Sequence, residues 1–195
     1  PLLAFWRALY FTPGEFRQEP NQTAEWNRGA YLVQGLGHCA ACHTGRTALG
    51  GPLGHDSLGG GLMPGSGWYA PALGSDPVTG IGEWDAADLA SLLKTGVSQR
   101  GAAMGPMAEV VGASLQHVSH TDVTAMATYL KSLPKSESVA VSNSAGNAGD
   151  PAAVLRLGAK LYEQNCASCH GDNGKGAPPA YPSLAGNRAL ALGDP

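Results

Sequence analysis

The pattern of apolar and polar positions predicts two amphipathic helices in the middle of the chain. The first spans residues 86–94, with Asp85 placed to cap its start and Gly96 to end it. The second begins after Thr121 and is stopped by Pro134. Their apolar stripes, each spaced as on one helix face, consist of Leu89, Leu92 and Leu93 in the first helix and of Val123, Met126, Ala127 and Leu130 in the second.

Two more short helices are predicted, each directly before a similar cysteine-containing motif. Residues 26–33 precede the first motif and residues 156–162 precede the second. In the second segment Gly158 and Tyr162 are four residues apart and therefore share one helix face, where the glycine permits a close helix approach. The repeated order of helix and motif predicts two copies of one module.

The stretches between these helices are rich in glycine, proline and small polar residues. Residues 44–82 show no helical period, and so long a loop is expected in a compact domain only where it wraps something. Residues 135–150 lack any periodicity and are predicted to be a flexible linker. We therefore expect a first domain over residues 20–134 and a second that begins at residue 151.

Composition narrows the possible functions. The 195 residues include 28 glycines and 14 prolines, while only 14% are charged and 7% are aromatic. The net charge of −3 excludes a nucleic-acid binder that works through a basic surface. No run of about 18 apolar residues is present to span a membrane. Side chains alone would scarcely fill two cores in such a chain, so another group is expected to fill them.

The cysteines predict what that group is. All four lie in two C-x-x-C-H motifs, which consist of Cys39, Cys42 and His43 and of Cys166, Cys169 and His170. This spacing is typical of haem c attachment. The two thiols add across the two vinyl groups of one porphyrin, and the next residue lies beneath the iron as its proximal ligand. Since the motifs use every cysteine, we predict two covalent haem c groups with His43 and His170 as axial ligands.

Two thiol-only alternatives fit less well. A thioredoxin-like redox motif would lie beside a parallel sheet, and the chain has no run of Val/Ile-rich strands to build one. A structural zinc site usually has its cysteine pairs about 15–20 residues apart, whereas more than a hundred residues separate Cys42 from Cys166. Neither alternative gives the histidine after each pair a role.

Several longer stretches resemble one protein family. They are WNRGAYLVQGLGHCAACHT at 26–44, GWYAPAL at 67–73, GIGEW at 80–84, GPMAEVV at 105–111 and DVTAMATYLKSLP at 122–134. Together they resemble the multihaem, triheme-type cytochrome c subunit of bacterial membrane-bound periplasmic dehydrogenases for alcohols, aldehydes, gluconate and related substrates. The fold expected from the residues and this resemblance is all-α, with two class I cytochrome c-like modules of few helices and long loops around haem.

The same resemblance assigns the parts of the chain. Residues 1–19 resemble the segment that joins the family's first two haem modules. Residues 20–134, the first module of this chain, resemble the second module of the family, and residues 151–195 resemble the start of its third. The chain is therefore expected to be a fragment, with one module before it and the rest of the last module after it. Packing as a linker is expected for the apolar residues 2–11, with docking on a partner as the alternative.

The distal ligand of the first haem is expected to be a methionine, which raises the reduction potential and closes the sixth coordination position. Met126 lies on a core stripe and Met63 is close to His43 in sequence. Met104 and Met107 lie in a predicted Gly/Pro-rich loop before the last helix and could both reach the iron. The resemblance implies Met107, the methionine of GPMAEVV. No methionine follows His170, so the distal ligand of the second haem lies beyond the chain or is another residue.

Further residues are expected to surround the haems. A proline carbonyl in a P-x-L-x-G turn accepts the proximal histidine proton in small cytochromes c, and Pro182 with Leu184 matches this pattern in the second module. Pro52 is the nearest counterpart in the first module. The resemblance places three more residues at the haem edge, namely Trp68, Tyr69 and Pro71, and core filling is their alternative role.

These expectations lead to electron transfer rather than catalysis. No pair of acidic residues suggests acid–base chemistry. The resemblance implies a dehydrogenase catalytic subunit as electron donor and ubiquinone or a terminal oxidase as acceptor. It also implies a bacterial periplasmic location, peripheral on the outer face of the cytoplasmic membrane and held there by parts outside this chain. The alternative is a dihaem peroxidase-like enzyme, which needs one open iron site.

Overall fold

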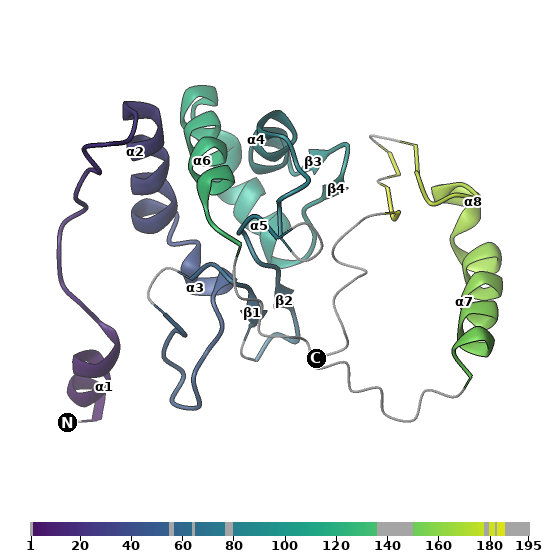
Figure 1. Ribbon diagram of the computed structural model, residues 1–195, viewed down its shortest axis with the longest axis horizontal. Helices are drawn as coiled ribbons and strands as arrows, with labels where there is room; N and C mark the ends of the chain where they lie inside the picture. The colour runs from purple at the N-terminus through teal and green to yellow at the C-terminus, as the bar shows by residue number, and fades with distance from the viewer. Residues whose placement is uncertain are drawn as a thin grey trace.

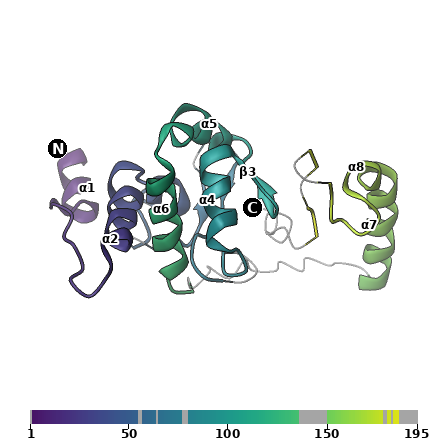
Figure 2. The same ribbon diagram turned by 90° about the horizontal axis from the view of Figure 1, so that it is seen from above.

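Three crossing helices form the framework of the structure, a computed structural model (Figure 1). They are α2 (Ala24–Tyr31), α4 (Ala86–Thr95) and α6 (His120–Ser132). Helix α6 lies between α2 and α4 and contacts both, as Figures 1 and 2 show. The structure describes residues 2–54, 57–63, 65–76, 80–135, 150–177, 180–181 and 183–185.

The ends of α4 and α6 follow from local capping. Asp85 accepts a hydrogen bond from the backbone N–H of Asp88, and Gly96 closes α4 in the left-handed conformation at φ 79°, which confirms the predicted bounds. Helix α6 starts earlier than predicted, at His120 instead of after Thr121. The reason is that the hydroxyl of Ser119 accepts from the N–H of Asp122 and thereby caps the helix.

Helices α2 and α6 cross at very short range. A Cβ atom at position 29 would overlap the carbonyl oxygen of Ala125 and lie 2.9 Å from Cβ of Tyr129, so only glycine fits there. Beside this contact, the rings of Trp26 and Tyr129 meet edge to face at 5.0 Å, and Trp26 Nε1 donates to Ser132 Oγ at 2.6 Å. Backbone contact and aromatic packing together fix this crossing.

An ion pair closes the exposed side of the same crossing. Arg28 on α2 donates to both carboxylate oxygens of Asp122 on α6, at 2.7 and 3.0 Å. The Arg28 guanidinium lowers the pKa of Asp122, and the carboxylate in turn raises the pKa of Arg28. Since both groups are exposed to water, the pair serves mainly to orient the helices.

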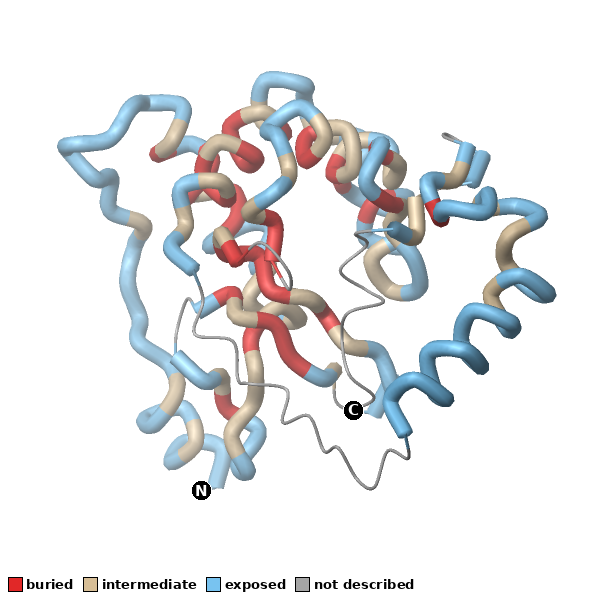
Figure 3. Tube along the Cα trace, turned by 45° about the vertical axis from the view of Figure 1, so that its right-hand side comes forward, coloured by how far each residue is buried: buried red, intermediate tan, exposed pale blue. Residues whose placement is uncertain are grey.

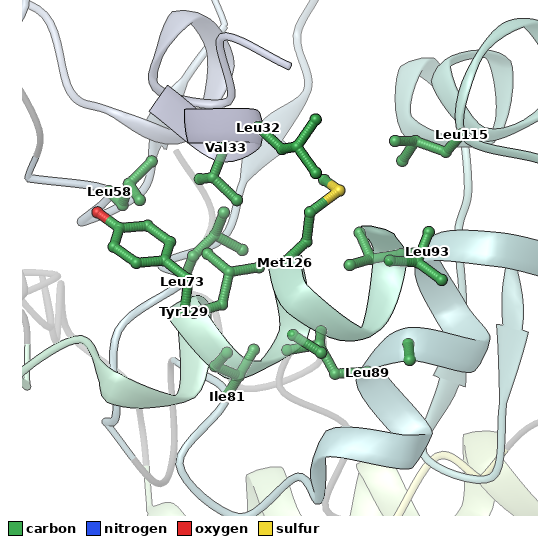
Figure 4. Packing of buried hydrophobic residues seen from close by; sticks show 14 of the residues in the cluster. Leu32, Val33, Leu58, Leu73, Ile81, Leu89, Leu93, Leu115, Met126 and Tyr129 are labelled. Carbon is green, nitrogen blue, oxygen red and sulfur yellow. The ribbon is translucent and has the colours of Figure 1, made fainter. Parts of the chain in front are cut away.

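The hydrophobic core lies where these helices meet the loop segments. Figure 3 shows that buried residues concentrate in this part of the chain. In Figure 4 the side chain of Met126 lies among core residues from α4 and α6 and from the segment after α2. The expected packing role of Met126 thus agrees with its exposure of only 2%. The largest fully buried side chains are Ile81, Leu130, Val33, Val123 and Thr44.

Short elements connect the framework helices. Strands β1 (Gly61–Leu62) and β2 (Tyr69–Ala70) form one antiparallel hairpin, and β3 (Val97–Ser98) and β4 (Gly101–Ala102) form another. Helix α5 (Pro106–Ala113) and a 3₁₀ turn at Leu115–His117 lead into α6. The sequence prediction of a loop around Met107 was wrong here, because Pro106 starts a helix at its first position.

The N-terminal segment folds as helix α1 (Leu2–Tyr10), which the sequence pattern did not predict. Trp6 Nε1 donates to the carbonyl of Leu49 at 3.0 Å, and the hydroxyl of Thr47 bonds to that of Tyr10 at 3.1 Å. The Tyr10 ring also lies directly on Gly51. Helix α1 is therefore attached to residues 47–51 of the first module.

Helix α7 (Pro151–Asn165) and the short α8 (Ala167–His170) form the second helix-and-motif unit. Asp150 caps α7 by accepting from the N–H of Ala152 at 3.0 Å. None of the residues of α7 is buried. Helices form most of the regular structure in the part of the chain that the structure describes, as expected. Among the residues placed in the structure, no helix has both the length and the apolar character needed to cross a membrane.

Candidate haem-binding site

The first C-x-x-C-H motif forms a single helical turn. Helix α2 continues into a π-helix (Leu32–Leu36), and the motif follows with α3 (Ala40–His43). The carbonyl of Cys39 accepts from the N–H of Cys42 at 3.2 Å and from that of His43 at 2.9 Å. Because residues three and four apart share a helix face, the two thiols and the imidazole are presented on the same side.

The imidazole of His43 is held by a backbone carbonyl. Its Nδ1 lies 2.7 Å from the carbonyl oxygen of Pro71. This bond assigns the proton to Nδ1 and the lone pair to Nε2, the atom that can then coordinate a metal. Pro71, and not Pro52 as expected, therefore holds His43. Pro52 instead forms an isolated bridge with Arg46.

Gly60 holds the Pro71 segment against the motif. Its N–H donates to the carbonyl of His43 at 2.8 Å, and its φ of 81° favours glycine. A Cβ atom at position 60 would lie 2.7 Å from the nitrogen of Ala72 and 3.0 Å from the carbonyl carbon of Pro71. The sequence analysis missed Gly60, since its neighbours come from residues distant in the chain.

The candidate distal ligand lies in the first turn of α5. Met107 is half-buried against the hydrophobic core, whereas Met104 is 70% exposed. Met63 belongs to the β1–β2 hairpin, where its N–H donates to the carbonyl of Trp68 at 2.8 Å. This environment favours Met107 over Met104, and its role as the iron ligand stays a prediction.

Trp68 brings the hairpin into contact with the methionine turn. A Cβ atom at Gly105, the residue that caps α5, would lie 2.5 Å from Cζ2 of Trp68. The hairpin segment from Trp68 to Pro71 therefore reaches the methionine turn at one end and His43 at the other. Tyr69, within this segment, pairs with Leu62 in the hairpin. The predicted haem contacts of these residues stay predictions.

Burial of Cys39 favours a neutral sulfur. Desolvation raises the pKa of this thiol to about 11, so the thiolate is disfavoured near neutral pH. Redox thiols and zinc ligands react or bind as thiolates, whereas a thioether sulfur carries no charge. Within the described residues no group of three or more His, Cys, Asp or Glu side chains is arranged to hold a metal ion.

Thr44, directly after His43, gives a further indication of what the motif accommodates. Its hydroxyl oxygen is buried and has no hydrogen-bond partner among the residues that the structure describes. Buried polar atoms are normally satisfied, and this one belongs to the residue that follows His43 in the chain. Together with two thiols and an imidazole on one helix face, it fits a haem held at this motif.

The second motif repeats the backbone hydrogen bonds of the first. The carbonyl of Cys166 accepts from the N–H of Cys169 at 3.2 Å and from that of His170 at 2.9 Å. The carbonyl of His170 accepts from Gly176 at 2.8 Å, as that of His43 does from Gly60. In both motifs the helical turn therefore has the same hydrogen-bond pattern, and a glycine N–H bonds the carbonyl of the histidine.

Less of the surroundings of the second motif is described. Pro182, the predicted acceptor for His170, lies outside the described residues. Leu184 is half-buried, and its N–H donates to the carbonyl of Gly174 at 2.8 Å. The ring of Tyr181 stands edge to face with His170 at 6.1 Å. The haem-packing roles of Pro182 and Leu184 stay predictions.

Comparison with known proteins agrees with this geometry. Residues 27–134 and 155–195 match the cytochrome c family. The chain is 39% identical, over 99% of its length, to the cytochrome c subunit of a quinone-dependent alcohol dehydrogenase of Gluconacetobacter polyoxogenes, of which it covers 44%. It is 40% identical, over 84% of its length, to the fructose dehydrogenase cytochrome subunit of Gluconobacter japonicus, of which it covers 37%.

A third relative is the gluconate 2-dehydrogenase cytochrome c subunit of Pantoea cypripedii, which is 37% identical over 94% of this chain and 44% of its own length. The chain thus spans less than half the length of these relatives. The resemblance to cytochrome c subunits of dehydrogenases, stated from the sequence motifs, is confirmed.

Proposed function

The chain belongs to the cytochrome c family, and from this premise we propose that it is an electron-transfer protein with two covalent haem c groups. One haem is attached at Cys39 and Cys42 and the other at Cys166 and Cys169. The hydrogen bond from Nδ1 of His43 to the carbonyl of Pro71 is the observation that supports the proposal most strongly. It leaves Nε2 as the basic nitrogen at the end of a C-x-x-C-H turn, as a proximal iron ligand requires.

In each motif the chain's own residues have distinct tasks. The two cysteines of each motif would hold the haem through thioether bonds, formed by addition of each S–H across a vinyl double bond, with sulfur on one carbon and hydrogen on the other. His43 keeps its proton on Nδ1, where Pro71 holds it, and Thr44 and the loop around Gly60 enclose the motif. When bound, haem c supplies one-electron exchange between ferric and ferrous iron.

Met107 is proposed as the distal ligand of the first haem. Of Met104 and Met107, only Met107 is half-buried against the core. The β1–β2 hairpin links the turn that carries Met107 to the segment that holds His43. A thioether and an imidazole together fill both axial positions and so favour electron transfer over substrate binding. The architecture proposed with this site is two class I modules, over residues 20–134 and from residue 151 onward.

The relatives support a place for the chain in a dehydrogenase complex. They are cytochrome subunits of alcohol, fructose and gluconate dehydrogenases. We propose that electrons arrive from a dehydrogenase catalytic subunit and leave to a quinone or a terminal oxidase. The proposed location is the bacterial periplasm, peripheral on the outer face of the cytoplasmic membrane, with membrane contact made by parts of the complex outside this chain.

A haem count tests the proposal. The chain is produced with haem-attachment machinery, and its pyridine haemochrome is measured for the wild type and two double variants. We expect two haems in the wild type and one each in Cys39→Ala/Cys42→Ala and in Cys166→Ala/Cys169→Ala, because each pair holds its own haem. The two variants are matched controls for each other. A wild type without a c-type spectrum would contradict the proposal.

A further inference from the structure

The indole of Trp68 lies on the backbone of Gly105 although the side chain is 45% exposed. Three atoms of its six-membered ring lie 2.5–2.7 Å from the place where a Cβ atom of residue 105 would be. An indole inside the core would be enclosed on all sides, whereas Trp68 covers one turn of chain and leaves its other side to water. Core filling therefore does not describe its position.

The covered turn is the one that carries Met107. Gly105 caps α5 in a conformation of φ 52° and ψ −134°, and its carbonyl accepts from the N–H of Ala108 at 3.0 Å. The carbonyl of Met104 accepts from the N–H of Met107 at 3.2 Å. Since no side chain of residue 105 intervenes, the indole presses directly on the backbone that sets the direction of Met107.

The position of Trp68 itself is fixed from both sides. Its carbonyl accepts from Met63 across the hairpin at 2.8 Å, and its N–H donates to the hydroxyl of Ser66 at 3.3 Å. Three residues later the carbonyl of Pro71 holds His43. One extended segment therefore links the histidine to the methionine turn.

We propose that Trp68 is a positioning residue for Met107, holding the Met104–Met107 turn so that the thioether stays at the axial position. This inference rests on the proposed function, in which Met107 is the distal ligand. Without the indole, the Met104–Met107 turn moves away from the iron more often. An external ligand then competes with Met107 for the coordination position. Because apparent affinity scales with the fraction of open sites, loss of this packing raises imidazole affinity by about tenfold.

The test compares Trp68→Ala and Trp68→Phe with the wild-type holoprotein. The readouts are the near-infrared Met-to-iron charge-transfer band of the ferric protein and the apparent affinity of the first haem for added imidazole. We expect Trp68→Ala to weaken the band and to bind imidazole about tenfold more tightly. Trp68→Phe keeps an aromatic ring on Gly105 and is expected to restore most of both signals.

Trp6→Ala is the matched control, because Trp6 lies in α1 and donates to the carbonyl of Leu49, outside the segment that links Trp68 to Met107. Haem content and far-ultraviolet circular dichroism verify that each variant is folded. Unchanged band and imidazole affinity in folded Trp68→Ala would overturn the inference alone. A wild type with haem but no methionine band would overturn Met107 as ligand, and a wild type without haem would overturn the proposed function.

Discussion

Two backbone contacts place the imidazole of the first motif, and both come from residues distant in sequence. Pro71 accepts from Nδ1 of His43, and Gly60 donates to the carbonyl of the same histidine. Gly60 also packs on the backbone around Pro71, so the three residues form one unit. A substitution at Gly60 is therefore expected to shift His43, because the two residues are joined through their backbones.

Replacement of Gly60 by alanine tests this unit. The variant must adopt a φ near 81° and also place a methyl group 2.7 Å from the nitrogen of Ala72. Gly50→Ala is the matched control, because Gly50 has a φ of 77° and no atom within 4 Å of its Cβ position. Denaturant unfolding is expected to give a loss of about 1 kcal/mol for Gly50→Ala and of about 3 kcal/mol for Gly60→Ala.

Equal losses for the two variants would show that only the backbone conformation matters. The close approach of Gly60 to the Pro71 segment would then contribute nothing to stability.

At this scale the sequence identified local motifs more readily than contacts between residues distant in the chain. The cysteines and histidines were found because their spacing is local and specific. Pro71 was expected at the haem edge and Pro52 at the histidine, yet Pro71 holds His43. The Pro-x-Leu spacing of Pro71 and Leu73, the same as that of Pro182 and Leu184, was the available signal. The spacing marks Pro71 as a candidate, but the path of the loop between residues 44 and 71 decides that its carbonyl lies at the ring.

Among the elements, the crossing of α2 and α6 depends most on a single residue. Gly29 lets the two backbones touch at Ala125, with Tyr129 beside them. Both helices support the site. Helix α2 leads into the first motif, and α6 contributes Met126 and Leu130 to the core. Separation of these helices would loosen the core beneath the motif.

Gly29→Ala is expected to lower the free energy of unfolding by roughly 2–3 kcal/mol, because the methyl group meets a backbone carbonyl that cannot turn aside. Gly112→Ala in α5 is the matched control. It adds the same methyl group at a helical position where no other atom lies within 4 Å. The free energy of unfolding is expected to stay the same or to rise by about 0.5–1 kcal/mol. Thermal or denaturant unfolding of the holoprotein measures both, and a neutral Gly29→Ala would show that the crossing is not tightly packed.

Helix prediction succeeded where the caps are local and failed where they are not. Asp85 and Gly96 bound α4 as expected. Helix α5 was predicted as a loop because glycine and proline surround Met107, although proline at the first helical position is a start signal. The hairpins have two-residue strands, too short for an alternating pattern to be visible.

Across the whole molecule, burial is unevenly distributed. The core lies among α2, α4, α6 and the segments between them, whereas no residue of α7 is buried. Local stability follows buried contacts, so the two parts of the chain are expected to open with different free energies.

Hydrogen exchange measured by mass spectrometry gives this difference directly. Amides of α6 are expected to exchange slowest and those of α7 much faster, because exposed helices open without loss of packed contacts. Peptides from α4, also packed in the core, serve as the internal reference. Protection of α7 equal to that of α6 would show that another surface covers α7 in solution.

Two residues between the π-helix (Leu32–Leu36) and the first motif account for the unequal spacing of the two motifs from their preceding helices. Both preceding helices contain the sequence Gly-Ala-x-Leu, but Cys39 follows Gly29 by ten residues while Cys166 follows Gly158 by eight. The last helical residues, Leu36 and Asn165, each lie seven residues after these glycines, so the two additional residues before the first motif are Gly37 and His38. They form a short turn in which His38 adopts a φ of 34°. A connection outside the helix can therefore take up a difference in length ahead of a C-x-x-C-H motif while the hydrogen bonds within the motif stay the same.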